Sequence, residues 1–112
     1  MIAHASSQRL CLLACTVLGL AAPALAQQSK ALANGDARAG QVLAERDCVT
    51  CHTRRFGDAT TIYTRTDRKV QTPAQLLAQV QYCNIELKSG YFPEEEEHVA
   101  AYLNQQYYKF KP

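Results

Sequence analysis

The sequence predicts an all-α domain in the part of the chain that follows residue 35. Apolar residues recur at helical spacing in three segments, around residues 37–46, 73–85 and 93–103. A residue type that favours a helix start stands at the head of each segment: aspartate, threonine followed by proline, or proline. The chain also lacks a βαβ pattern. We therefore expect three main helices, with a long loop between the first and the second.

The N-terminus predicts a cleaved export signal. Arg9 precedes an apolar run from Leu10 to Ala22, and Ala24-Leu25-Ala26 follows. A basic residue, a run of this length and a final Ala-x-Ala are typical of a secretory signal. We expect residues 1–26 to be a cleaved signal peptide, residues 27–35 a flexible lead, and residues 36–112 one domain.

Two alternatives for this segment stay open. Leu12-Leu13-Ala14-Cys15 resembles a lipobox, which would make Cys15 a lipidated N-terminus, although the apolar run before it is short. The segment can also be retained as a membrane anchor. We expect contact with a membrane only in these two cases.

Charge and motifs exclude several function classes. The chain has 12 Lys and Arg, of which only Arg9 lies in the signal, against 10 Asp and Glu. This near balance argues against general nucleic-acid binding. There is no nucleotide-binding loop and no hydrolase constellation. We do not expect an enzyme.

The motif that carries chemistry is Cys48-Val49-Thr50-Cys51-His52. This C-x-x-C-H pattern is typical of covalent c-type haem attachment, because two thiols so spaced can add to the two vinyl groups of one porphyrin. The histidine that follows is then held under the iron as an axial ligand. A structural zinc site would need a second Cys/His pair, and only Cys83 and His98 remain downstream, far apart. We expect one covalent haem c, bound by Cys48 and Cys51, with His52 as proximal iron ligand.

The export signal and the motif support each other, since bacteria attach haem covalently outside the cytoplasm. We therefore expect the periplasm of a Gram-negative bacterium. A chain this small also gains from a large apolar cofactor on which its helices can pack. Cys83 is left without a partner in the same chain, so a disulfide between two chains is open to it.

Each helix has a distinct sequence signal. The first is expected from about Ala37 to Arg46, where Gly40 indicates either a tolerated weak position or a close helix crossing. The second begins at Thr72-Pro73, fades near residues 83–85, and has an apolar face that should rest on the haem. The third opens at Phe92-Pro93, and the four glutamates that follow, residues 94–97, complement the helix dipole.

The connection between the first two helices is basic. We expect a long loop over residues 53–72, with a short extended piece at residues 60–64. Its basic excess has three readings: a solvated loop, pairing of Arg54 or Arg55 with haem propionates, or a docking surface over residues 54–69 for an acidic redox partner.

The order of helix, C-x-x-C-H, long loop, middle helix and C-terminal helix resembles class I cytochrome c. The resemblance covers about Asp36 to Tyr107, and only the five-residue motif is highly specific. It implies a small cytochrome c fold whose first and last helices cross near Gly40 and Tyr102. It also implies single-electron transfer through the haem edge.

The chain departs from that family at the distal side of the iron. The family's distal ligand is a methionine, and the only methionine here is Met1, in the signal. The candidates are an open side or one closed weakly by Asn84, a thiolate from Cys83, His98, and more remotely Lys88 or Tyr91. The pair Cys83-Asn84 is faintly similar to an oxygen-binding cytochrome type that has an asparagine ligand, although that type carries a second cysteine.

These features lead to two function hypotheses. The first is a low-potential periplasmic electron carrier or haem subunit, because methionine ligation raises the haem potential and is lost here. The alternative is a binder or sensor of a small diatomic gas, which needs an open or displaceable distal position. A peroxidase is disfavoured, since no distal His/Arg pair can be assigned.

Overall fold

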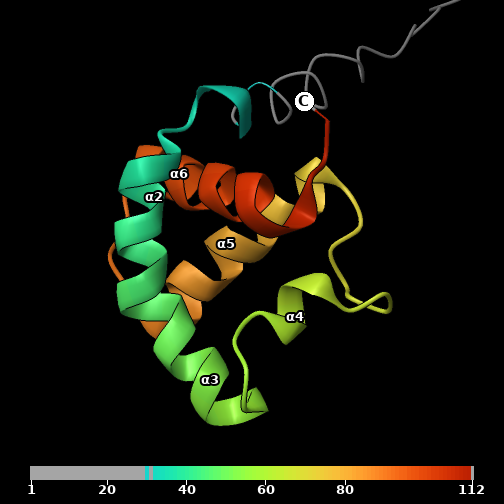
Figure 1. Cartoon of the computed structure of the whole chain (residues 1–112). Coiled ribbons are helices and arrows are strands. Elements are labelled where there is room, and N and C mark those ends of the chain that lie inside the picture. Colours follow the sequence, from blue (N-terminus) through green and yellow to red (C-terminus); the bar gives the residue numbers. More distant parts are fainter. Residues whose placement is uncertain (1–29, 31, 112) are drawn as a thin grey trace, which may run out of the picture.

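The computed structural model describes residue 30 and residues 32–111, and these form a helical domain without strands (Figure 1). The all-α prediction is confirmed. The predicted signal and Cys15 lie outside the described residues. No helix among the described residues combines the length and the apolar character needed to cross a membrane.

The first helix is longer than the sequence suggested. It runs as α2 (Ala37–Ala44), a π-helical segment η1 (Glu45–Val49) and α3 (Thr50–Phe56), with no break between them. The Asp36 carboxylate caps its start by accepting hydrogen bonds from the backbone N–H groups of Arg38 and Ala39. Its end is at Gly57, where φ is 80°, a conformation that favours glycine. The helix therefore passes through the C-x-x-C-H motif, and the expected end near Arg46 was wrong.

The loop after α3 contains a short helix in place of the extended piece we expected. Helix α4 (Thr61–Thr64) is closed by hydrogen bonds from Thr64 N and Arg65 N to the carbonyls of Thr60 and Thr61. The β-branched residues of this segment favoured a strand, and that prediction was wrong. Tyr63 is 5% exposed and belongs to the core, so tertiary packing outweighs local propensity here.

Helix α5 (Pro73–Leu87) starts where the sequence indicated. The Thr72 hydroxyl accepts a hydrogen bond from Gln75 N at 3.2 Å, and proline occupies the first turn. Leu76, Leu77 and Val80 are buried, as their spacing predicted. The helix continues to Leu87 and ends at Lys88, which adopts a left-handed conformation with φ of 52°.

Helix α6 (Pro93–Leu103) also begins at its predicted proline and continues into the π-helical segment η2 (Asn104–Tyr108). The Glu95 carboxylate accepts a hydrogen bond from Phe92 N at 2.8 Å, so an acidic residue caps the helix start. The aromatic tail folds back, and Tyr108 is 8% exposed within the core.

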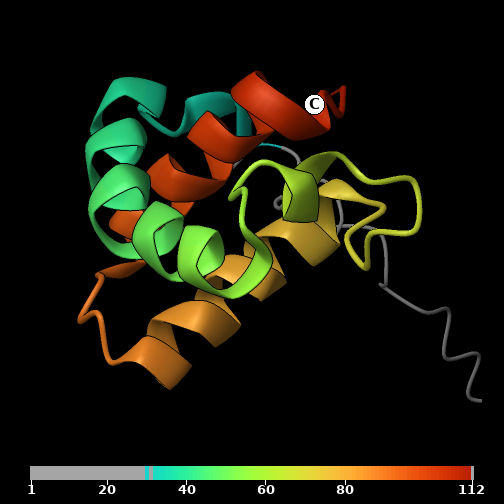
Figure 2. The same cartoon turned by 60° about the horizontal axis from the view of Figure 1, so that its bottom comes forward.

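Helices α2 and α6 cross in close contact, and they lie side by side in both views (Figures 1 and 2). A Cβ atom placed on Gly40 would lie 1.9 Å from the carbonyl oxygen of His98. Gly40 therefore permits backbone-to-backbone contact, which confirms the close-crossing interpretation. The resemblance to class I cytochrome c implied that Gly40 would meet Tyr102. In the structure Gly40 meets His98 and Val99, about one turn earlier in α6.

The core lies where α2, α5 and α6 meet, with α4 and the C-terminal segment closing one side (Figure 2). Leu76 and Val99 are its largest fully buried side chains. Leu32 is also buried, at 6% exposed, so the packed structure begins before Asp36.

Candidate functional site

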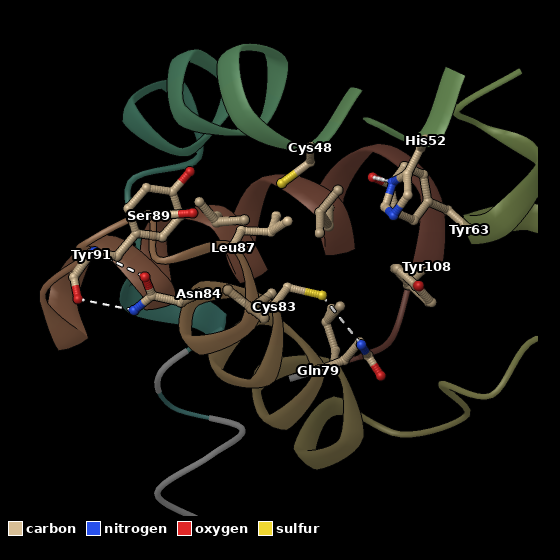
Figure 3. A pocket seen from close by; sticks show the side chains of 14 residues that line it. Cys48, His52, Tyr63, Gln79, Cys83, Asn84, Leu87, Ser89, Tyr91 and Tyr108 are labelled. Atoms are coloured by element: carbon tan, nitrogen blue, oxygen red, sulfur yellow. Dashed lines mark hydrogen bonds between the residues drawn. The ribbon is translucent and has the colours of Figure 1, made fainter. Parts of the chain in front are cut away.

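A cavity opens beside the core, between the motif-bearing helix and α5 (Figure 3). The volume that a water-sized molecule can occupy in it is about 40 Å³. Cys48 and His52 face it from one side, whereas Gln79 and Cys83 of α5 face it from the other (Figure 3). Most of the remaining wall is apolar or aromatic: Tyr63, Leu76, Val80, Leu87, Tyr91, Val99, Leu103 and Tyr108. Two residues of the predicted haem motif therefore share one apolar cavity.

The π-helical segment η1 places Cys48. This segment ends at Val49, one residue after Cys48, and α3 continues from Thr50. Short π-helical insertions shift the register of side chains and are frequent at functional sites. The Cys48 thiol is half-buried, and burial raises its pKa to about 11. Cys48 is thus a neutral, protonated thiol in an apolar wall at neutral pH.

His52 is held by a hydrogen bond to Tyr63. Its Nδ1 lies 2.7 Å from the Tyr63 hydroxyl oxygen, and the two rings meet edge to face at 5.3 Å. Burial lowers the pKa of His52, which favours the neutral imidazole. Burial also raises the pKa of Tyr63 far above its ordinary value, so the phenol stays protonated. The contact occupies Nδ1 and leaves Nε2 as the ring nitrogen available to a ligand.

Cys51 is placed differently. It is exposed and does not line the cavity, although it lies between Cys48 and His52 in the motif. No residue of α3 is buried, and the helix packs mainly against its chain neighbours η1 and α4. Such a segment is held by few apolar contacts and can reorient at low free energy.

Among the distal candidates, Cys83, Asn84 and Tyr91 line the cavity. The Cys83 sulfur is half-buried and accepts a hydrogen bond from Gln79 Nε2 at 3.3 Å (Figure 3). Among the described residues, no three His, Cys, Asp or Glu side chains are grouped as ligands of a bare metal ion.

The Asn84 side chain fastens the turn after α5. Its amide nitrogen donates to the Tyr91 carbonyl at 3.1 Å and to a Glu96 carboxylate oxygen at 2.7 Å. Its amide oxygen accepts from Tyr91 N at 3.0 Å. These three bonds join α5, the turn and α6, so Asn84 has a structural task that would have to be given up before it could bind iron.

His98 lies away from the cavity. Its Nδ1 accepts a hydrogen bond from Asp36 N at 2.9 Å, at the crossing of α2 and α6. Tyr91 lines the cavity, and its hydroxyl donates to the Asp47 carboxylate, which ties the turn to η1. Lys88 is exposed at the end of α5 and does not line the cavity.

The basic loop is divided between packing and solvent. Arg68 Nη1 donates to the Tyr63 carbonyl at 2.7 Å, and its guanidinium lies 4.7 Å from the Tyr108 ring centre. Arg65 pairs with Asp67 at 2.6 Å. Arg54 and Arg55 are exposed, as is Lys69, and within the described part of the chain none of them has a salt bridge.

The sequence did not identify Tyr63 and Gln79 as site residues. Tyr63 was expected only to pack, in a segment expected to be extended. Its spacing from His52 gives no local signal, because the two meet through the fold of α4. Gln79 stands four residues before Cys83, one helical turn away, and that spacing could have indicated the contact.

A comparison of the chain with protein-family models, curated proteins and solved structures finds no match.

Proposed function

We propose that this chain is a periplasmic c-type cytochrome that transfers single electrons through one covalently bound haem. The observation that carries the proposal is the shared cavity of Cys48 and His52. The thiol and the imidazole come from one C-x-x-C-H motif and face the same apolar space, with His52 Nε2 left available. Covalent attachment and iron ligation require this pairing.

The walls of the cavity fit a porphyrin in their chemistry. They are formed by aliphatic and aromatic side chains such as Leu76, Val99 and Tyr108, which would pack against a large apolar ring once the walls separate to admit it. Cys51 is the residue that fits least, because it is exposed. The proposal requires the Cys51 side chain to turn toward the ring in the loaded protein by a local change in α3 that leaves the His52–Tyr63 contact in place. No residue of α3 is buried, so few apolar contacts oppose that change.

When bound, haem iron supplies the one-electron chemistry. The chain's own residues set its surroundings: His52 provides a neutral nitrogen, and the apolar walls limit access of water. No methionine is present after Met1, so the high-potential Met/His ligation is excluded by composition. We therefore propose a low reduction potential.

Cys83 is the distal candidate that the geometry favours. Its sulfur faces the cavity opposite the motif, whereas Asn84 is held by three hydrogen bonds and His98 lies elsewhere. The Gln79 amide donates to this sulfur, a contact that would stabilise a thiolate. A bound thiolate would close the distal position and favour electron transfer over gas binding.

Carbon monoxide distinguishes the carrier from the gas binder. We expect that CO added to the reduced protein leaves the Soret band unchanged or shifts it slowly, because Cys83 holds the sixth position. The Cys83→Ser variant should bind CO at once, and Asn84→Ala, the matched control, should behave like wild type. Immediate CO binding by wild type would favour the alternative, a binder or sensor of a small diatomic gas.

The partner of the carrier is proposed to be an acidic redox protein. Arg54, Arg55 and Lys69 are exposed and available for docking, whereas Arg65 and Arg68 are used within the domain. Electrostatic docking of this kind weakens as salt rises. Replacing the three exposed cations by glutamine should slow electron transfer to an acidic partner at low salt and have little effect at high salt.

A further inference from the structure

Tyr63 is buried for a reason that packing alone does not explain. Its side chain is 5% exposed, stacks on Tyr107 at 5.0 Å and meets Tyr108 edge to face at 6.1 Å. A phenylalanine would make these apolar contacts equally well. The hydroxyl, however, needs a polar partner in a buried place, and that partner is Nδ1 of His52 at 2.7 Å.

The geometry points to Tyr63 as a positioning residue that orients His52 and lowers the reduction potential of the iron it binds. This inference rests on the proposed function. With Nε2 on the iron, the one remaining ring proton is on Nδ1, so Nδ1–H donates to the Tyr63 oxygen. A hydrogen bond accepted from a ligand histidine fixes its ring and increases its electron donation, which favours the more highly charged ferric state.

The acceptor is rigidly placed. Arg68 Nη1 donates to the Tyr63 carbonyl at 2.7 Å and holds α4 against the C-terminal aromatic residues. The same guanidinium lies over the Tyr108 ring. Tyr63 is therefore fixed at its backbone and on its ring faces, and its hydroxyl stands at Nδ1 before a ligand binds. A fixed acceptor needs little reorganisation when the charge on the iron changes.

The test is the reduction potential of Tyr63→Phe, with Tyr107→Phe as the matched control. Tyr107 stacks on the Tyr63 ring at 5.0 Å and does not line the cavity, so its substitution changes the same packing without touching the site. We expect Tyr63→Phe to weaken the ferric preference about tenfold, which raises the potential by about 60 mV at 59 mV per tenfold. Tyr107→Phe should stay near the wild-type value.

A spectroscopic signature separates this role from loss of packing. In the Cys83→Ser background, where the reduced iron has an open sixth position, the iron–histidine stretching frequency should fall in Tyr63→Phe and stay unchanged in Tyr107→Phe. An unchanged potential and frequency in Tyr63→Phe, or equal shifts in both variants, would overturn the inference. The proposed function would still stand in that case, provided that both variants carry covalent haem. A wild-type chain without covalent haem would overturn the proposed function and the inference together.

A second measurement needs no variant. In the reduced, diamagnetic protein, with CO added where needed, nitrogen-15 histidine spectra should show a slowly exchanging Nδ1 proton of His52. That proton should give a nuclear Overhauser effect to the Tyr63 ring. A proton that exchanges with solvent as fast as in free imidazole would contradict the inference, even if Tyr63→Phe cannot be purified.

Discussion

The substitution Gly40→Ala tests the helix crossing that fixes the motif-bearing helix. Alanine is the better helix former, so local propensity alone predicts a gain of about 1 kcal/mol. The structure predicts the opposite sign. An added Cβ would lie 1.9 Å from the His98 carbonyl oxygen, whereas ordinary contact begins at 3.4 Å, so α2 and α6 would have to separate by about 1.5 Å.

The expected size of the effect follows from the kind of atom that is met. A backbone oxygen cannot rotate away as a side chain can, so the overpacking penalty should be near the upper end of its usual range, about 3 kcal/mol. After the propensity gain, we expect a net loss of about 2 kcal/mol in the free energy of unfolding. For a domain of this size that lowers Tm by about 8 to 16 °C.

The assay is denaturant unfolding followed by circular dichroism, with Gly57→Ala as control. Gly57 has no atom within 4 Å of a built Cβ, and only its φ of 80° opposes alanine. The control should therefore lose about 1 to 3 kcal/mol through backbone strain without moving any helix, because φ of 80° with ψ of −41° is rarely adopted by residues other than glycine. A Gly40→Ala protein as stable as wild type, or more stable, would refute the crossing and the position it gives to Cys48.

Three further predictions concern single contacts. Thr72→Ala removes the cap of α5 and should lower the free energy of unfolding by about 1 kcal/mol, whereas Thr72→Ser should retain most of it; equal losses would contradict the capping role. Asn84→Ala leaves Tyr91 backbone groups without partners and should lower stability by about 1 to 3 kcal/mol in denaturant unfolding; a neutral result would show that the turn is held otherwise. Hydrogen bonds from Arg46 and Tyr91 lower the pKa of Asp47, so the ionised carboxylate stabilises the fold above its unfolded pKa of about 3.9, and this stabilisation is lost as pH falls below about 4. Asp47→Asn should therefore flatten the acid limb of a stability–pH curve. An unchanged acid limb would exclude Asp47 as the source of this pH dependence.

The helix starts could be predicted because their signals are local. Thr72 and Pro73 carry the cap and the fixed φ of α5 in two adjacent residues, and Pro93 does the same for α6. The buried face of α5 was likewise visible in the spacing of its apolar residues.

The parts that could not be predicted depend on contacts between distant segments. Helix α4 forms from residues that favour strands because Tyr63 packs against the C-terminal aromatic residues. The continuation of the first helix past Arg46, by contrast, was predictable, because neither glycine nor proline occurs between Gly40 and Gly57. The tasks of Asn84 and His98 are set by partners 12 and 62 residues away, and no local pattern announces them.

The candidate site divides in the same way. Its attachment residues follow from five consecutive letters of sequence, because the chemistry of thioether formation imposes their order. The hydrogen bond from His52 to Tyr63 and the placing of Cys83 opposite Cys48 follow only from the fold (Figure 3).

The most direct test of the account is the intact mass of the exported chain, made in a bacterium that matures c-type cytochromes and denatured in acid before weighing. The account predicts one species that is heavier than the polypeptide by one haem, and loss of that full covalent load in Cys51→Ala. A bare polypeptide mass for the exported wild type, or a full covalent haem on Cys51→Ala, would contradict it.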